Sequence, residues 1–106
     1  MSLSKKSRPE RRSLARQTAK DLRDRQRLAL LEPGGTPERP IEVVTASLVE
    51  PKARAQPCVA CGRTVRVDDH TAETIDGHPL RLAHTACPTC GLTRRVYFAI
   101  HPDLAN

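Results

Sequence analysis

Four cysteines of this 106-residue chain occur in two short units of the same pattern, Cys58-Val59-Ala60-Cys61-Gly62 and Cys87-Pro88-Thr89-Cys90-Gly91. Two residues between paired cysteines let one tight turn direct both sulfurs at one point, so two such turns supply the ligands of a tetrahedral ion with metal–sulfur bonds of about 2.3 Å. Glycine after the second cysteine suits a chain that leaves the turn at positive φ and lets backbone N–H groups approach the sulfurs. The spacing therefore predicts one metal site made of Cys58, Cys61, Cys87 and Cys90.

Short runs of alternating apolar and polar residues surround these units. Thr64–Asp68, Leu80–Ala83 and Arg95–Ile100 each place apolar side chains on one face, which predicts three antiparallel strands. The dipeptide Asp76-Gly77 is typical of a turn and lies in the loop between the first two strands. Because each cysteine unit precedes a strand, the two units are expected to meet at one end of a small sheet.

This pattern resembles the zinc-ribbon family, in which two such knuckles clamp Zn²⁺ above a three-stranded antiparallel sheet. The resemblance covers residues 57–101, and the four cysteines match the ligands of the family one by one. It implies a small metal-stabilised β domain with one structural zinc ion. It implies no particular function, because the motif recurs in proteins of many functions.

Two other interpretations of the cysteines are weaker. Rubredoxin-like iron sites share the knuckles, but Tyr97 and Phe98 are the only aromatic residues here, whereas the rubredoxin-like core is rich in aromatics. A redox dithiol is the second interpretation. It is weaker because the two complete cysteine pairs leave no odd thiol to react, and because the surrounding sequence lacks the βαβ pattern of such sites. Four cysteines also fill every coordination position, so the zinc is expected to be structural, and the metal-free domain largely unfolded.

The net charge of +6 is concentrated in the N-terminal segment. Residues 1–31 carry ten basic and three acidic side chains, a net charge of +7, whereas the other 75 residues carry eight and nine, a net charge of −1. Good helix-forming residues from Pro9 to Leu31, followed by Glu32-Pro33-Gly34-Gly35, predict a basic α-helix. A disordered arm that orders on a partner is the alternative, because such a polar helix is marginal in water without packing.

The remaining segments are predicted to connect or to end the chain. Residues 32–56 hold four of the nine prolines, and Pro57 follows directly, which indicates a linker, with residues 41–49 as a possible edge strand. Residues 102–106 form a short tail. No run approaches the roughly 18 apolar residues of a membrane span, and no apolar region of an export signal follows Arg11-Arg12, so we expect a soluble, cytoplasmic protein without membrane partners.

Arginines are the candidate contacts to nucleic acid. The N-terminal basic segment has no aromatics and suits phosphate contacts. If the apolar residues of the three strands all face the core, alternation puts Arg66, Arg81, Arg95 and Tyr97 together on the opposite face, where they could hold phosphates and stack a base. A solvated face in which Asp68 and His70 pair with those arginines across strands is the alternative. The candidate contacts are Arg8, Arg11, Arg12, Arg16, Lys20, Arg23, Arg27, Arg66, Arg81, Arg95 and Tyr97.

The chain shows no catalytic constellation. It has no Ser-His-Asp set and no glycine-rich phosphate loop, and the cysteine site leaves no position for a water ligand. We therefore expect a non-enzymatic zinc-ribbon protein without a small-molecule substrate, an accessory of RNA, the ribosome or the transcription machinery that uses its basic arm. The alternative is a protein–protein interaction adaptor that docks through the ribbon and the N-terminal helix.

Overall fold

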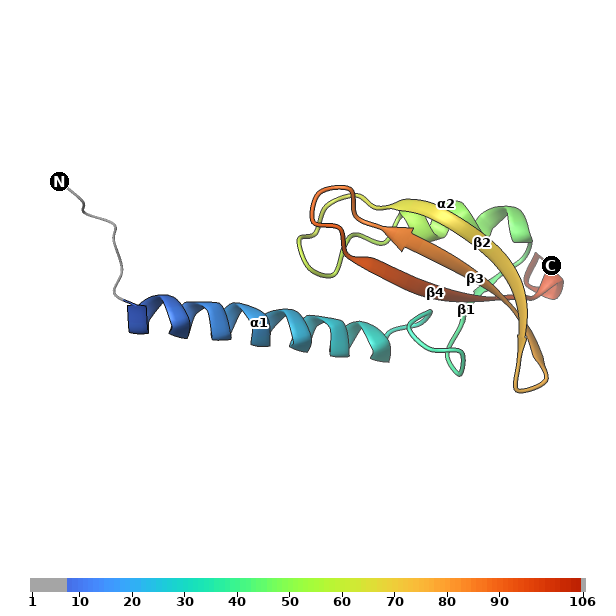
Figure 1. Cartoon of the computed structure of the whole chain (residues 1–106). Helices are drawn as coiled ribbons and strands as arrows, with labels where there is room; N and C mark the ends of the chain where they lie inside the picture. Colours follow the sequence, from blue (N-terminus) through green and yellow to red (C-terminus); the bar gives the residue numbers. More distant parts are fainter. Residues whose placement is uncertain (1–7, 106) are drawn as a thin grey trace.

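The structure is a computed structural model that describes residues 8–105, with side chains described from residue 11 to residue 103. Lys5 and Lys6 of the basic segment, the side chain of Arg8 and Asn106 of the predicted tail lie outside this part. The elements along the chain are α1 (Arg8–Leu31), β1 (Ile41–Val43), the 3₁₀ turn η1 (Ala46–Leu48), α2 (Val49–Arg54), β2 (Arg66–Ile75), β3 (His78–Ala86), β4 (Thr93–Ile100) and the 3₁₀ turn η2 (Pro102–Ala105) (Figure 1).

The strands form one mixed sheet in the order β1-β4-β3-β2. β2, β3 and β4 are antiparallel, as predicted, but the expected loop between the first two strands is mostly strand, because β2 continues to Ile75 and β3 begins at His78. Only Asp76 and Gly77, at φ 50° and 80°, form the tight turn between them. The prediction of a three-stranded sheet is wrong, because β1 adds a fourth strand. Ile41 and Val43 are β-branched, and β1 pairs in parallel with the edge of β4.

Residues 32–56 belong to the folded domain and do not form a linker. Val43 of β1 and two residues of α2, Val49 and Ala53, are fully buried and share one apolar cluster with Phe98 of β4. Val49 and Ala53 are four residues apart, so both face the sheet from the same side of α2. The strand expected over residues 41–49 ends at Val43 because the chain then turns into η1 and α2 to cover the sheet.

The register of β3 and β4 differs from the one assumed in the sequence analysis. Leu82 lies opposite Tyr97, and Arg81 lies opposite Phe98. Leu82 therefore shares a face with Tyr97, whereas Arg81 lies on the face that α2 covers. The inner strand β3 is buried on both faces, so its apolar residues do not indicate which face is the core.

The sheet face away from α2 carries three of the four predicted residues. Arg66 begins β2 opposite Ala86, and the register puts it on the same face as Arg95 and Tyr97 of β4. The predicted common face of Arg66, Arg81, Arg95 and Tyr97 is thus corrected to one without Arg81. We call this surface the open face.

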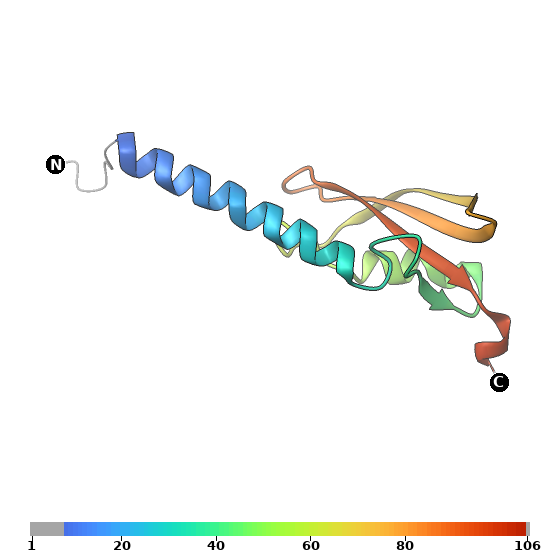
Figure 2. The ribbon, with the colours of Figure 1, turned by 90° about the horizontal axis from the view of Figure 1, so that it is seen from below.

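Helix α1 projects from the domain and makes the molecule long. The Cα radius of gyration is 18.0 Å, compared with about 13 Å for a compact domain of this length. Only its last turns contact the domain, where Ala29 is buried and the C-terminal end lies beside β4 (Figure 2). Gly35 permits this approach, because a Cβ there would lie 2.4 Å from the carbonyl oxygen of Ala29.

If α2 is part of the core, shortening a side chain on its inner face destabilises the whole domain. Val49→Ala is expected to lower the free energy of unfolding by about 1–3 kcal/mol, since Val49 has no exposed surface. Lys52→Ala, on the exposed side of the same helix, should change it by less than about 0.5 kcal/mol. Thermal unfolding at one fixed metal concentration measures both, and equal effects would contradict this placement of α2.

Candidate metal centre

Two turns with the same backbone hydrogen bonds carry the four cysteines. In the first, the N–H of Gly62 donates to the carbonyl of Cys58 at 2.8 Å, and the N–H of Cys58 donates to the carbonyl of Arg63 at 2.9 Å. In the second, Gly91 and Cys87 make the equivalent bonds at 2.8 and 2.9 Å. Both glycines have positive φ, 75° and 80°, as the sequence predicts. The two knuckles therefore have the same local fold.

The knuckles meet at one end of the sheet and bring their sulfurs together. All four Sγ atoms lie within 4.8 Å of one another. The closest pairs join the two knuckles, Cys58 with Cys90 and Cys61 with Cys87, each at 3.5 Å. A disulfide would need about 2.05 Å, whereas a tetrahedral ion with bonds of about 2.3 Å needs sulfurs about 3.8 Å apart. The spacing fits four thiolates around one ion.

Backbone N–H groups stabilise thiolate character at the site. The pKa of Cys87 is lowered to about 6, chiefly because the N–H of Cys90 donates to its sulfur, with the N–H of Thr89 and the neighbouring thiols acting in the same direction. The pKa of Cys90 rises to about 11. The N–H of Leu92 lowers it, but the side-chain hydrogen bond with Cys58, burial and the other thiols outweigh that effect. A cation at the centre of the cluster would displace the protons that remain on these sulfurs.

The inner side of the site is apolar, and the outer side is open to solvent. Cys58 and Cys87 are buried and pack with Val65 in an apolar cluster separate from the one around Phe98, while Cys61 and Cys90 are exposed. Loss of the knuckles would thus remove one of the two clusters that hold the domain together.

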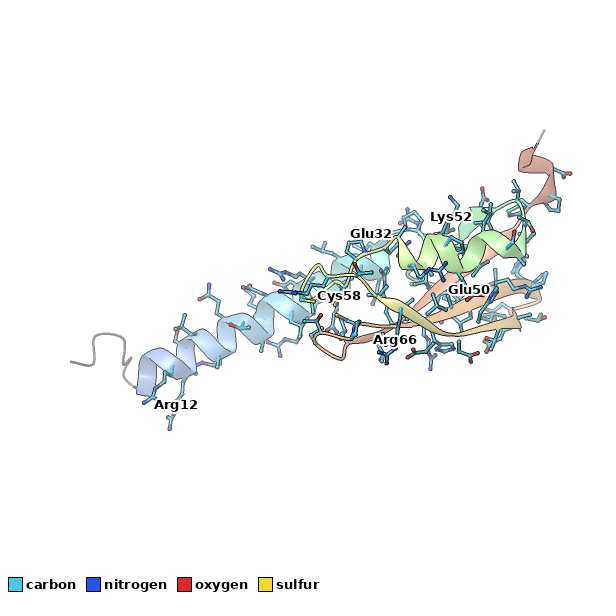
Figure 3. The ribbon with its side chains drawn as sticks, turned by 90° about the horizontal axis from the view of Figure 1, so that it is seen from above. Arg12, Glu32, Glu50, Lys52, Cys58 and Arg66 are labelled. Carbon is cyan, nitrogen blue, oxygen red and sulfur yellow. The ribbon has the colours of Figure 1, made fainter. Side chains whose placement is uncertain are left out.

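Arg25 connects the projecting helix to the first knuckle. Its guanidinium donates to the carbonyl of Ala60, between the two cysteines of that knuckle, at 2.9 Å. Figure 3 shows Cys58 where α1 reaches the domain, with Arg12 near the far end of the helix. The direction of α1 is therefore set partly by the conformation of the cysteine loop.

Arg94 and Arg39 hold the C-terminal end of α1. The half-buried Arg94 donates to the carbonyl of Ala29 at 3.5 Å and to Gln56 at 3.0 Å, and burial lowers its pKa. Arg39 donates to the carbonyl of Leu31 at 2.6 Å. Both cations meet the negative end of the helix dipole. Sequence reasoning missed these roles of Arg25, Arg39 and Arg94, and no local pattern marks them, because two of the contacts join residues 35 and 65 positions apart.

The predicted nucleic-acid contacts fall into separate groups. Five exposed residues of α1 are spaced so that they line one side of the helix, within an arc of about 80°. We call this set the basic stripe; it consists of Arg12, Arg16, Lys20, Arg23 and Arg27. In the part of the chain that the structure describes, no ion pair within 4.0 Å involves these side chains.

The other candidates lie off the stripe. Arg11 is exposed on a different side of α1, and Arg8 belongs to the first turn, with its side chain outside the described part. On the open face, Arg66 pairs at 2.6 Å with Asp68 of the same strand and not across strands, while Arg95 is exposed and Tyr97 half-buried. Arg81 is separated from them by the sheet.

This chain matches no protein-family model, no curated protein and no solved structure. Within residues 8–105, no helix is both long and apolar enough to cross a membrane. The arguments for function therefore rest on the cysteine cluster, the basic stripe and the surfaces around them.

The cluster is expected to take up one divalent ion per chain. Titration with Co²⁺ should give the absorption bands of a tetrahedral thiolate site that saturate at one equivalent. Cys87→Ser should abolish these bands, and Thr89→Ser, an exposed position between the cysteines of the same knuckle, should preserve them. Equal cobalt spectra for the two variants would refute the assignment of Cys87 as a ligand.

Proposed function

We propose that this chain is a non-enzymatic zinc-ribbon protein that binds the phosphate backbone of nucleic acid through α1, as an accessory of RNA, the ribosome or the transcription machinery. The basic stripe is the main observation in support of this proposal. Its five cationic side chains are exposed and line one side of a helix that projects from the domain. Zinc would hold the first knuckle in one conformation, and the knuckle in turn fixes the attached end of α1, because the carbonyl of Ala60 accepts a hydrogen bond from Arg25.

Zinc is the ion that best suits the cysteine cluster. Four thiolates in tetrahedral spacing are typical of structural zinc, and they leave no coordination position for a reacting water. Two of the ligands, Cys58 and Cys87, lie in the smaller apolar cluster, so their coordination adds to the stability of the fold. Iron is less suited, since Tyr97 and Phe98 provide little of the aromatic shell of rubredoxin-like sites.

The distribution of charge favours α1 as the contact to phosphate. Residues 1–31 carry +7 and the remaining residues −1, and four thiolates around Zn²⁺ add a further −2. A phosphate backbone is therefore attracted to the helix and repelled by the domain at longer range. Four of the five stripe residues are arginines, whose planar guanidinium matches the geometry of a phosphate.

The protein-adaptor alternative has support of its own from the exposed leucines of α1. Leu28, Leu30 and Leu31 have 61%, 54% and 62% of their surface exposed near the C-terminal end of the helix. They do not lie on one side of the helix, because Leu28 and Leu30 are two residues apart. A groove that holds an amphipathic helix requires one apolar stripe, so this surface is a weaker candidate than the basic stripe.

Elemental analysis of purified protein is expected to give one zinc per chain and little iron. A strong chelator should remove the cooperative thermal transition, because coordination contributes roughly 10–16 kcal/mol of folding free energy in comparable sites. Addition of Zn²⁺ should restore the transition. A folded, metal-free protein with an unchanged transition would contradict the structural role of zinc.

Binding to a DNA or RNA duplex should depend on the stripe and on salt. Arg16→Gln with Arg23→Gln removes two phosphate contacts, so the slope of log K against log[salt] should fall in magnitude by about 1.8. The matched control, Lys52→Gln with Arg54→Gln, removes the same charge from exposed positions of α2 and should leave that slope nearly unchanged. Fluorescence anisotropy at several salt concentrations measures both.

Equal slopes for the two double variants would refute the stripe as the binding surface. Partner binding that does not weaken with salt would favour the adaptor function, because an apolar interface releases no counterions.

A further inference from the structure

A cleft separates the last turns of α1 from β4. It is lined by Gln26, Ala29 and Leu30 of the helix and by Thr93, Arg95 and Tyr97 of the strand, and its volume is about 310 Å³. That volume lies at the lower end of the range for small-molecule pockets, roughly 300–1,000 Å³. The cleft lies on the open-face side of β4, away from α2.

Tyr97 gives this cleft an aromatic side chain. The chain contains one tyrosine, one phenylalanine and no tryptophan. Phe98 is completely buried in the core, whereas Tyr97 is only half-buried and lines the cleft. Of the tyrosine and the phenylalanine, only Tyr97 can be reached by a ligand, and it lies in the cleft, where a flat ring can stack on it.

Positive charge approaches the cleft from both sides. Arg95 precedes Tyr97 by two residues on β4, so both side chains lie on the same face, and Arg95 is exposed. On α1, Arg23 precedes Gln26 by three residues and is therefore its neighbour on the helix surface. Arg23 of the basic stripe thus lies one helical turn from a residue of the cleft, where an aromatic ring lies beside a second arginine.

We propose that the cleft accepts an unstacked base of single-stranded nucleic acid, which stacks on Tyr97 while the flanking phosphates contact Arg95 and the basic stripe. This inference rests on the proposed function and specifies its ligand. In a duplex the faces of the bases are covered by their neighbours, so only a single strand, a loop or an end can offer a base to Tyr97. A groove of basic residues with an aromatic platform is the common arrangement for single strands.

The single tyrosine provides a direct test. Because the protein has no tryptophan, its intrinsic fluorescence on excitation at the tyrosine band comes from Tyr97 alone. Addition of a 12-nucleotide oligothymidine to the zinc-loaded full chain should quench this emission. An abasic 12-mer, which has the same phosphates, should bind more weakly and quench little. Free N-acetyltyrosinamide titrated with the same strands corrects for absorption by the bases.

Two substitutions separate the stacking of Tyr97 from the charge of the stripe. Tyr97→Leu should weaken binding of the oligothymidine roughly 5- to 150-fold, the range for loss of one base–aromatic stack, and Tyr97→Phe should retain most of it. A 12-base-pair duplex should bind both variants as it binds wild type. Arg16→Gln with Arg23→Gln should weaken binding of both probes.

The outcomes distinguish the two proposals. Oligothymidine binding without quenching, or with the same affinity in Tyr97→Leu, overturns the stacking site and leaves the phosphate-binding function intact. No binding of either probe by wild type overturns both. If Tyr97→Leu loses its zinc or its thermal transition, the wild-type quenching compared with the abasic strand decides the question alone.

Discussion

Four sulfurs must reach one point, and this requirement governs the rest of the structure. The first knuckle precedes β2 and the second connects β3 to β4, so their meeting brings the beginning of β2 beside the end of β3. The equivalent hydrogen bonds of the two knuckles allow them to approach as matched halves. The end of the sheet at the cysteines is thereby closed, and the small cluster with Val65 forms beneath it.

The opposite end of the domain depends on ordinary packing. Phe98 and Val96 of β4 are covered by α2, which arrives from a segment rich in proline. Two separate apolar clusters of this size are modest for a domain of about 100 residues. The cysteine cluster and the packing around Phe98 therefore lie in different parts of the sheet, and β3 and β4 run through both.

The sequence predicts best what is encoded locally. The knuckles, the Asp76-Gly77 turn and the extent of α1 depend on residues within a few positions of one another, and each agrees with the structure. The prediction that residues 32–56 form a linker is wrong. Their prolines suggest an extended chain, whereas the burial of Val43 and Val49 depends on strands far along the sequence.

The prediction of which residues share a face of the sheet is wrong for a related reason. Leu82 and Ala83 are both buried although they point to opposite sides, so apolar alternation along β3 contains no information about the core. The open face consequently differs from the predicted one by Arg81. The contacts of Arg25 and Arg94 with distant backbone carbonyls have no local pattern either, and they decide how α1 is held. Whether α1 binds nucleic acid remains a prediction, which the charge of residues 1–31 motivates.

The attachment of α1 at one end has a mechanical consequence. Ala29 is the buried pivot, and Arg12 lies about 25 Å from it along the helix axis at about 1.5 Å per residue. A tilt of about 10° at the pivot moves Arg12 by about 4 Å, comparable to the separation of neighbouring side chains on a helix. A change in the hydrogen bond between Arg25 and Ala60 that tilted α1 would therefore displace the far end of the stripe more than the attached end.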